Sequence, residues 1–218
     1  MAWKPSRMAW VVVGALLSLT QGPQVSAQNA NSRIQSSAEP EQVVLASSGS
    51  YDAFFGALRH RESSGNYRAV NTLNFIGAYQ FGEAALIDLG YVRRDRDVYD
   101  NNFSGGFTGK NGIRSVADFL ANPAVQDDAA REWMQIMWRY IEADGLDRYA
   151  WRQVGGVTLS PSGMLAATHL LGPGALRQFV NSNGRADIRD PYGMPLRNYI
   201  VDLGGYSIPF APRGPGLS

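Results

Sequence analysis

The longest helical pattern in this sequence begins at Asn122-Pro123 and ends near Asp144-Gly145, and it does most to restrict the fold. Asn followed by Pro favours the start of a helix, and Gly favours its end. Apolar residues between these signals recur at helical spacing and form one stripe: Ala129, Trp133, Ile136, Met137, Tyr140 and Ile141. Such a stripe is typical of a core-facing helix, so we expect a mainly α domain built around it.

Shorter elements are expected on both sides of this helix. Helices are predicted at 51–62, 83–89, 160–171, 175–180 and 196–203, each from caps or breaking residues at its ends. Residues 67–70 and 75–79 favour β structure and flank a turn-like insert at 71–74, which predicts a small hairpin. Residues 95–112 form a polar, Gly- and Asn-rich loop that is long enough to suggest a functional role. The predicted fold class is therefore mainly α, with one small hairpin.

The N-terminus has the pattern of a secretory signal peptide. Lys4 and Arg7 precede an apolar stretch at 8–19, and Val25-Ser26-Ala27 resembles a cleavage signal. The apolar stretch is shorter than the roughly 20 residues that span a bilayer, so no stable membrane anchor is expected. The predicted organisation is a signal peptide at 1–27, a flexible linker at 28–50, a catalytic domain at 51–206 and a flexible tail at 207–218.

The charge of the mature protein restricts the partners that it is expected to bind, and its cysteine content restricts what can stabilise its fold. Cleavage after Ala27 would leave 18 basic and 19 acidic residues, a formal charge of −1. A nearly neutral protein is not expected to bind nucleic acid. The chain contains no cysteine, so an exported form would rely on its hydrophobic core without disulfides.

Glu62 is the strongest candidate for a chemical role. Phe54, Leu58 and Glu62 recur at a spacing of four, which places the carboxyl on the apolar face of its helix. Burial and the negative end of the helix dipole both favour the protonated acid, the form that donates a proton in glycosidic bond cleavage. The structural alternative is a helix-end salt bridge with Arg59 or Arg61.

Three segments together resemble the lysozyme-like lytic transglycosylases, of the soluble lytic transglycosylase type. They are Glu62-Ser63, Gly77-Ala78-Tyr79-Gln80-Phe81 and Gly172-Pro173-Gly174, and the resemblance covers roughly residues 51 to 180. The family's Glu-Ser motif supplies the catalytic acid, which falls here on Glu62. His169 stands where the family's third motif has a tyrosine. It could donate a hydrogen bond to Glu62 or substrate, or be a packed helix residue.

The resemblance implies a lysozyme-like fold, with the hairpin beside a cleft that binds peptidoglycan strands. Glu62 would be the general acid and base that cleaves the bond between N-acetylmuramic acid and N-acetylglucosamine, leaving a 1,6-anhydro product. No cofactor or metal is implied. The expected substrate-binding residues are Ser63, Ser64, Tyr79, Gln80 and His169; Tyr67, Phe103 and Tyr149 are further candidates for lining the cleft. The protein would be exported, most naturally to the periplasm, with secretion into the medium as the alternative.

Other functions remain open at this level. A hydrolytic muramidase would need a second carboxylate, for which Glu83 and Asp88 are candidates. A non-catalytic module could hold glycan, and residues 28–50 could contact an envelope or secretion-machine protein. A metal site at His60, Glu62 and His169 is disfavoured, because His60-Arg61-Glu62 lacks the His-Glu-x-x-His spacing. A serine hydrolase is disfavoured because no Gly-x-Ser-x-Gly elbow exists.

Overall fold

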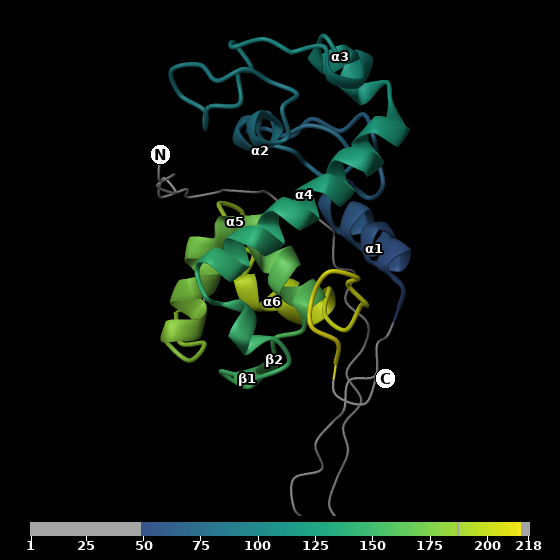
Figure 1. The fold of residues 1–218 in the computed structure, drawn as a ribbon. Helices are drawn as coiled ribbons and strands as arrows, with labels where there is room; N and C mark the ends of the chain where they lie inside the picture. Colours follow the sequence, from purple (N-terminus) through teal and green to yellow (C-terminus); the bar gives the residue numbers. More distant parts are fainter. Residues whose placement is uncertain (1–48, 187, 215–218) are drawn as a thin grey trace, which may run out of the picture.

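The computed structural model describes residues 49–186 and 188–214, and this part of the chain is mainly helical. The helices are α1 (Tyr51–Ser63), α2 (Glu83–Asp88), η1 (Lys110–Gly112), α3 (Val116–Leu120), α4 (Pro123–Ala143), η2 (Asp147–Tyr149), α5 (Pro161–Asn181) and α6 (Leu196–Asp202). Figure 1 shows α4 crossing the molecule, with α2 and α3 toward one end and α5 and α6 toward the other. The prediction of a mainly α fold is confirmed.

α4 is the helix that the sequence pattern predicted most clearly. Asn122 is its N-cap residue and Pro123 occupies its first turn. The apolar stripe is buried except at Tyr140, which is half-buried and donates a hydrogen bond from its hydroxyl to Asp88 Oδ2 at 2.9 Å. α4 therefore joins the two ends of the domain through one continuous core.

α5 is the most deeply buried helix, and nearly all of its residues before Pro173 lie in the core. Ser160 caps it, accepting a hydrogen bond from Gly163 N–H at 3.2 Å and another from Gly205 N–H at 2.9 Å. The predicted break at 172–174 is a kink: Gly172 has φ 76°, a conformation that favours glycine, and Pro173 cannot donate to the preceding turn. The helix then resumes to Asn181.

The predicted hairpin at 67–79 is corrected by the structure. That segment makes only isolated bridges, Val70 with Ile76 and Ile76 with Phe81. Asn74, Gly77 and Gln80 all have positive φ, so the chain turns repeatedly instead of extending. The regular two-stranded antiparallel sheet lies elsewhere, between β1 (Gln153–Val154) and β2 (Val157–Thr158).

The C-terminal boundary also differs from the prediction. Residues 207–214 pack on the domain: Ser207 N–H donates to Gly49 O at 3.0 Å, the Phe210 ring meets Tyr51 edge-on, and Trp151 donates to Pro212 O at 2.8 Å. These residues therefore belong to the folded domain rather than to a flexible tail. The predicted signal peptide, and all but residues 49 and 50 of the predicted linker, lie outside the described residues.

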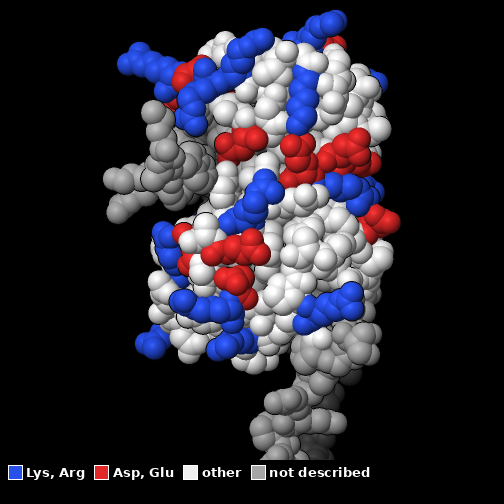
Figure 2. All heavy atoms as spheres, in the orientation of Figure 1, with Lys and Arg blue, Asp and Glu red and all other residues white. Residues whose placement is uncertain are grey.

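No helix in the described part of the chain is long and apolar enough to cross a membrane. On the face drawn in Figure 2, basic and acidic side chains are interspersed, and acidic groups form a band across its middle. This face therefore lacks the broad, purely basic surface that typically binds a polyanion.

Candidate active site

Glu62 lies in the last turn of α1 and faces the interior. Ser64 is the C-cap residue of α1, and its positive φ of 54° ends the helical conformation. The backbone N–H groups of Ser64 and Gly65 close the final turn on the carbonyls of His60 and Arg59. This C-terminal cap holds the carboxyl of Glu62 against the core, where the residue is only 1% exposed. The apolar-face prediction for Glu62 is confirmed.

Burial raises the pKa of Glu62 to about 8. The Tyr199 hydroxyl and the Arg61 guanidinium oppose this rise, whereas the Asp190 carboxylate adds to it. Neither carboxyl oxygen of Glu62 lies within hydrogen-bond distance of a described residue, although the Tyr199 hydroxyl, which also has no such partner, interacts with the carboxylate closely enough to lower its pKa. The predicted alternative, a salt bridge with Arg59 or Arg61, is not formed, because these guanidinium groups pair with Asp127 and Asp202 at 3.1 Å each. Glu62 is therefore a neutral, unpaired acid near pH 7.

His169 lies beside Glu62 but is held by other groups. Its Nδ1 accepts a hydrogen bond from the Trp133 indole at 3.2 Å, so the proton is on Nε2, which donates to the Tyr79 carbonyl at 3.0 Å. Nε2 is 3.8 Å from Glu62 Oε1, and burial lowers the pKa of His169 to about 4. A neutral imidazole at this distance makes no ion pair, so in this structure His169 joins α4, α5 and the Tyr79 segment.

Tyr79 is fully buried, and its hydroxyl belongs to a polar network. Arg59 donates to this hydroxyl at 2.8 Å, and the hydroxyl donates to Asp127 Oδ1 at 2.7 Å. Tyr67 donates to the same carboxylate at 2.9 Å. The Tyr79 ring is therefore not exposed for stacking on a sugar in this structure, and its visible role is to connect α1 with α4.

The other residues of the first two motifs hold the end of α1 in place. Ser63 donates from its hydroxyl to Ala78 O at 2.9 Å, and Gln80 is buried and donates to Gly77 O at 2.8 Å. Ser64 is exposed at the helix end. Through the Ser63–Ala78 bond and the contact of His169 with Tyr79, the second motif and His169 are held beside the end of α1, whereas no contact links Gly172-Pro173-Gly174 itself to Glu62 among the described residues.

Gln126 is a buried residue of α4 that the sequence patterns did not reveal. Its Oε1 accepts from Ala78 N–H at 2.8 Å, and its amide donates to the carbonyls of Tyr67 and Phe119. A Cβ at Gly77 would lie 2.3 Å from Gln126 Oε1, and Gly77 has φ 79°. The second motif therefore has glycine at position 77 because a side chain there would clash with Gln126 and would strain a backbone of positive φ.

The structure places a different carboxylate near Glu62 from those considered in the sequence. Glu83 is fully buried and accepts from Phe103 N–H at 2.8 Å, and Asp88 accepts from Tyr140. Asp190 is the carboxylate whose charge raises the pKa of Glu62. It is buried and accepts from the backbone N–H groups of Tyr192 and Met194. In the sequence, the only local feature that distinguishes Asp190 is the Asp190-Pro191 pair, which is typical of a turn.

Residues 188–195 form a short segment that contains Asp190 and is called the covering loop here, because we propose below that it controls access to Glu62. The Arg61 guanidinium contacts Met194 Sδ at 3.0 Å. The Tyr192 hydroxyl contacts the hydroxyl of Thr72, which lies 120 residues earlier in the sequence. The covering loop therefore bridges the end of α1 and the 71–74 turn. Glu62, on which the charge of Asp190 in this loop acts, is 1% exposed.

A pocket of about 400 Å³ opens beside the same turn. Residues 72–75, Gly82, Ala84 and residues 98–101 line it. Tyr99 is 45% exposed there and offers a ring to solvent. Of the other aromatic candidates, Tyr67 is bonded to Asp127, Phe103 packs on Phe107, and the Arg148 guanidinium lies over Tyr149.

Comparisons with known proteins found no match: no family model, no curated protein and no solved structure is similar to this chain. The functional argument therefore rests on the geometry around Glu62.

Proposed function

We propose that this protein is an exported, lysozyme-like lytic transglycosylase that cleaves the β-1,4 bond between N-acetylmuramic acid and N-acetylglucosamine in peptidoglycan. The observation that carries the proposal is the Glu62 carboxyl, buried without a hydrogen-bond partner among the described residues and with a pKa raised to about 8. A stable fold gains nothing from such a group, because an unpaired buried polar group is costly. A general acid requires this protonated form near neutral pH.

A single carboxyl can complete the proposed reaction. Protonated Glu62 donates its proton to the glycosidic oxygen, the bond from that oxygen to the muramyl C1 breaks, and the N-acetylglucosamine 4-hydroxyl leaves. The Glu62 carboxylate then accepts the proton of the muramyl C6 hydroxyl while O6 bonds to C1. The product is a 1,6-anhydro sugar, Glu62 is again protonated, and no water is consumed.

A hydrolytic muramidase is the second candidate, and the position of Asp190 favours it. Hydrolysis with a second carboxylate needs a charged group near the acid. Asp190 is close enough to affect the pKa of Glu62, whereas Glu83 has no such effect on Glu62 and binds the Phe103 amide. Under this route, Asp190 would replace Glu83 as the partner of Glu62. A non-catalytic glycan-binding module is the third candidate.

The products of peptidoglycan digestion distinguish these functions. We expect the protein to release muropeptides lighter by one water than their reducing counterparts, as measured by mass spectrometry. Reducing-end products that disappear in Asp190→Asn would support the muramidase instead. No release by the wild-type protein, combined with retention on insoluble peptidoglycan in a pull-down, would support the binding module.

Because Glu62 is buried, cleavage requires part of the structure to move, and we infer that this part is the covering loop, which contains Asp190 and contacts Arg61 of α1. The contact between the Tyr192 and Thr72 hydroxyls favours the closed form. We expect Tyr192→Phe to increase the initial rate of peptidoglycan cleavage roughly two- to tenfold, because losing one hydrogen bond shifts a two-state equilibrium by about that factor. Turbidity loss of a peptidoglycan suspension measures the rate.

Thr72→Val is the matched control, since it removes the same contact from the other side. It should give the same increase as Tyr192→Phe, and the double variant should give no more than either alone. Unchanged or lower rates in both single variants would contradict a covering role for this loop.

A further inference from the structure

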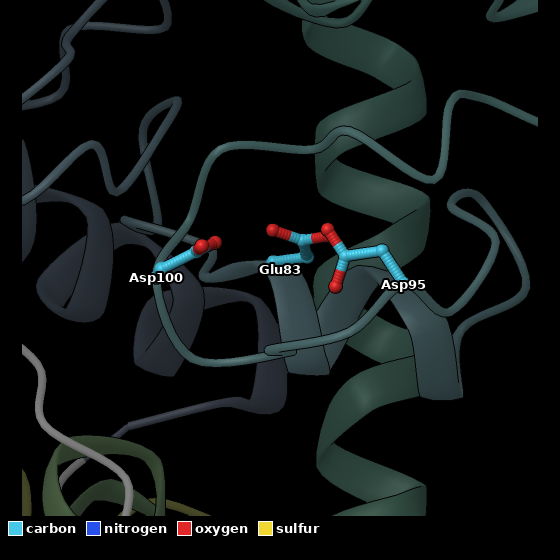
Figure 3. A group of neighbouring side chains, drawn as sticks. All are labelled: Glu83, Asp95 and Asp100. Carbon is cyan, nitrogen blue, oxygen red and sulfur yellow. The ribbon is translucent and has the colours of Figure 1, made fainter.

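A second group of acidic side chains lies outside the Glu62 site. Glu83 begins α2, and Asp95 and Asp100 belong to the loop that follows it, residues 95–104, called the acidic loop here. One carboxylate oxygen from each residue lies within 4.8 Å of the other two. Figure 3 shows the three carboxyl groups pointing toward one another from α2 and two sides of the loop. Three like charges this close repel one another unless a cation or protons neutralise them.

Glu83 provides a separate observation that points to a ligand. The residue is 0% exposed, and its Oε2 accepts from Phe103 N–H at 2.8 Å. Its Oε1 is buried and has no hydrogen-bond partner among residues 49–186 and 188–214. A buried oxygen without a donor is rare in folded proteins and calls for a bound group. This oxygen belongs to the carboxyl that lies between Asp95 and Asp100 in Figure 3.

We propose that Glu83, Asp95 and Asp100 bind a calcium ion. All three ligands are carboxylates, and hard oxygen ligands favour calcium or magnesium over the transition metals, which prefer nitrogen and sulfur. Calcium accepts irregular ligand geometry, whereas magnesium requires a near-ideal octahedron. Asp95 is half-buried and Asp100 is exposed, so the ion would have an entry path and positions left for water.

The ion would hold one wall of the pocket described above. The acidic loop is already tied to α2 by two bonds: Glu83 N–H donates to Asn101 Oδ1 at 2.8 Å, and Phe103 N–H donates to Glu83. Asp100 and Asn101 line the pocket together with residues 72–75, and Asn101 donates to Leu73 O at 2.9 Å. Calcium at the carboxylates would neutralise the repulsion between the loop and α2 and so stabilise this wall. The inference does not depend on the catalytic role of Glu62.

Calorimetric titration of the chelator-treated full-length protein with calcium chloride tests the proposal, with magnesium chloride at equal ionic strength as the comparison. We expect one calcium site per chain, weaker binding of magnesium, and a rise in the unfolding midpoint of roughly 5 °C at saturating calcium. Asp100→Asn should weaken calcium binding about tenfold or more.

Asp97→Asn is the matched control, because Asp97 lies in the same loop and carries the same charge but is not one of the three clustered ligands. It should bind calcium within about twofold of the wild-type protein, since the lost charge is exposed and screened by solvent, and the Asp97 backbone N–H that donates to Asp95 Oδ1 at 3.0 Å is retained. Glu83→Gln provides a second test: it should remain folded without calcium and lose the calcium-dependent rise in midpoint.

Three outcomes would overturn the proposal. The first is the absence of both heat and a midpoint shift with calcium. The second is equal weakening by Asp97→Asn and Asp100→Asn, which would indicate general charge attraction. The third is an unchanged calcium response in Glu83→Gln. The first outcome would mean that protons rather than calcium neutralise the cluster, and the other two would mean that calcium binds elsewhere or without specific ligands.

Discussion

Glu62→Gln is expected to reduce peptidoglycan cleavage by at least about a thousandfold, because an amide can neither donate nor accept the proton in either proposed step and acid–base catalysis contributes on this order. The amide has nearly the shape of the carboxyl, so the buried position next to α5 and α6 should remain filled. Release of soluble muropeptides over time measures the rate, and circular dichroism measures the fold.

Glu132→Gln is the matched control for this substitution. Glu132 is also on a helix, but its side chain is 49% exposed and pairs with Lys110 at 2.8 Å. Its replacement should leave the rate within about twofold of wild type, because exposed ion pairs contribute little. A Glu62→Gln protein that folds and retains the full rate would show that Glu62 is not the proton donor.

The second large effect concerns stability, since Glu62→Gln should stabilise the protein at alkaline pH. The pKa of Glu62 rises from 4.5 in the unfolded chain to about 8 in the folded protein. Between these values the unfolded chain has lost a proton that the folded protein retains, so the free energy of unfolding falls as pH rises from 4.5 to 8. The loss amounts to about 5 kcal/mol above pH 8. Glutamine does not titrate and should escape this loss.

His169 makes the wild-type pH profile more complex. Its pKa falls from 6.5 in the unfolded chain to about 4 in the folded protein, so its contribution to stability rises as pH increases from 4 to 6.5. Between pH 4.5 and 6.5 the effects of His169 and Glu62 oppose each other, and above 6.5 only the Glu62 effect remains. The decisive quantity is therefore the difference between Glu62→Gln and wild type.

Urea unfolding of both proteins from pH 4 to pH 9 measures this difference. We expect it to be near zero at pH 4 and to grow with pH until about pH 8. A difference that stays constant across this range would mean that Glu62 has an ordinary pKa and is not kept neutral by burial. Arg61, Tyr199 and Asp190 are present in both proteins, so their own contributions largely cancel.

The sequence was most informative where a structural signal is local. Ser50 caps α1, Asn122 and Pro123 begin α4, and Gly172 kinks α5, as their residue types predict. The location of Glu62 on the buried face of α1 also followed from spacing alone, since a helix repeats every 3.6 residues whatever surrounds it. The sequence also indicated His169, which lies 3.8 Å from Glu62 and contacts the Tyr79 carbonyl of the second motif.

The predicted hairpin and tail show where local signals were insufficient. Residues 67–79 contain β-favouring side chains, yet positive φ at three positions and the contacts of Gln126 make the segment turn. Residues 207–214 have the composition of a flexible tail, yet Trp151 and Tyr51 hold them on the domain. In both cases partners more than 40 residues away override the local preference.

By itself, the sequence determined the longer helices, the caps of α1 and α4, and a carboxyl on a buried helix face, because these depend on residues within a few positions of one another. Only the tertiary structure decided that His169 is neutral and held by Trp133 and Tyr79, and that Asp190 is the carboxylate whose charge acts on Glu62. It also brought Glu83, Asp95 and Asp100 together. Proton positions, pKa values and ligand clusters depend on distances between residues far apart in the chain, and packing alone sets those distances.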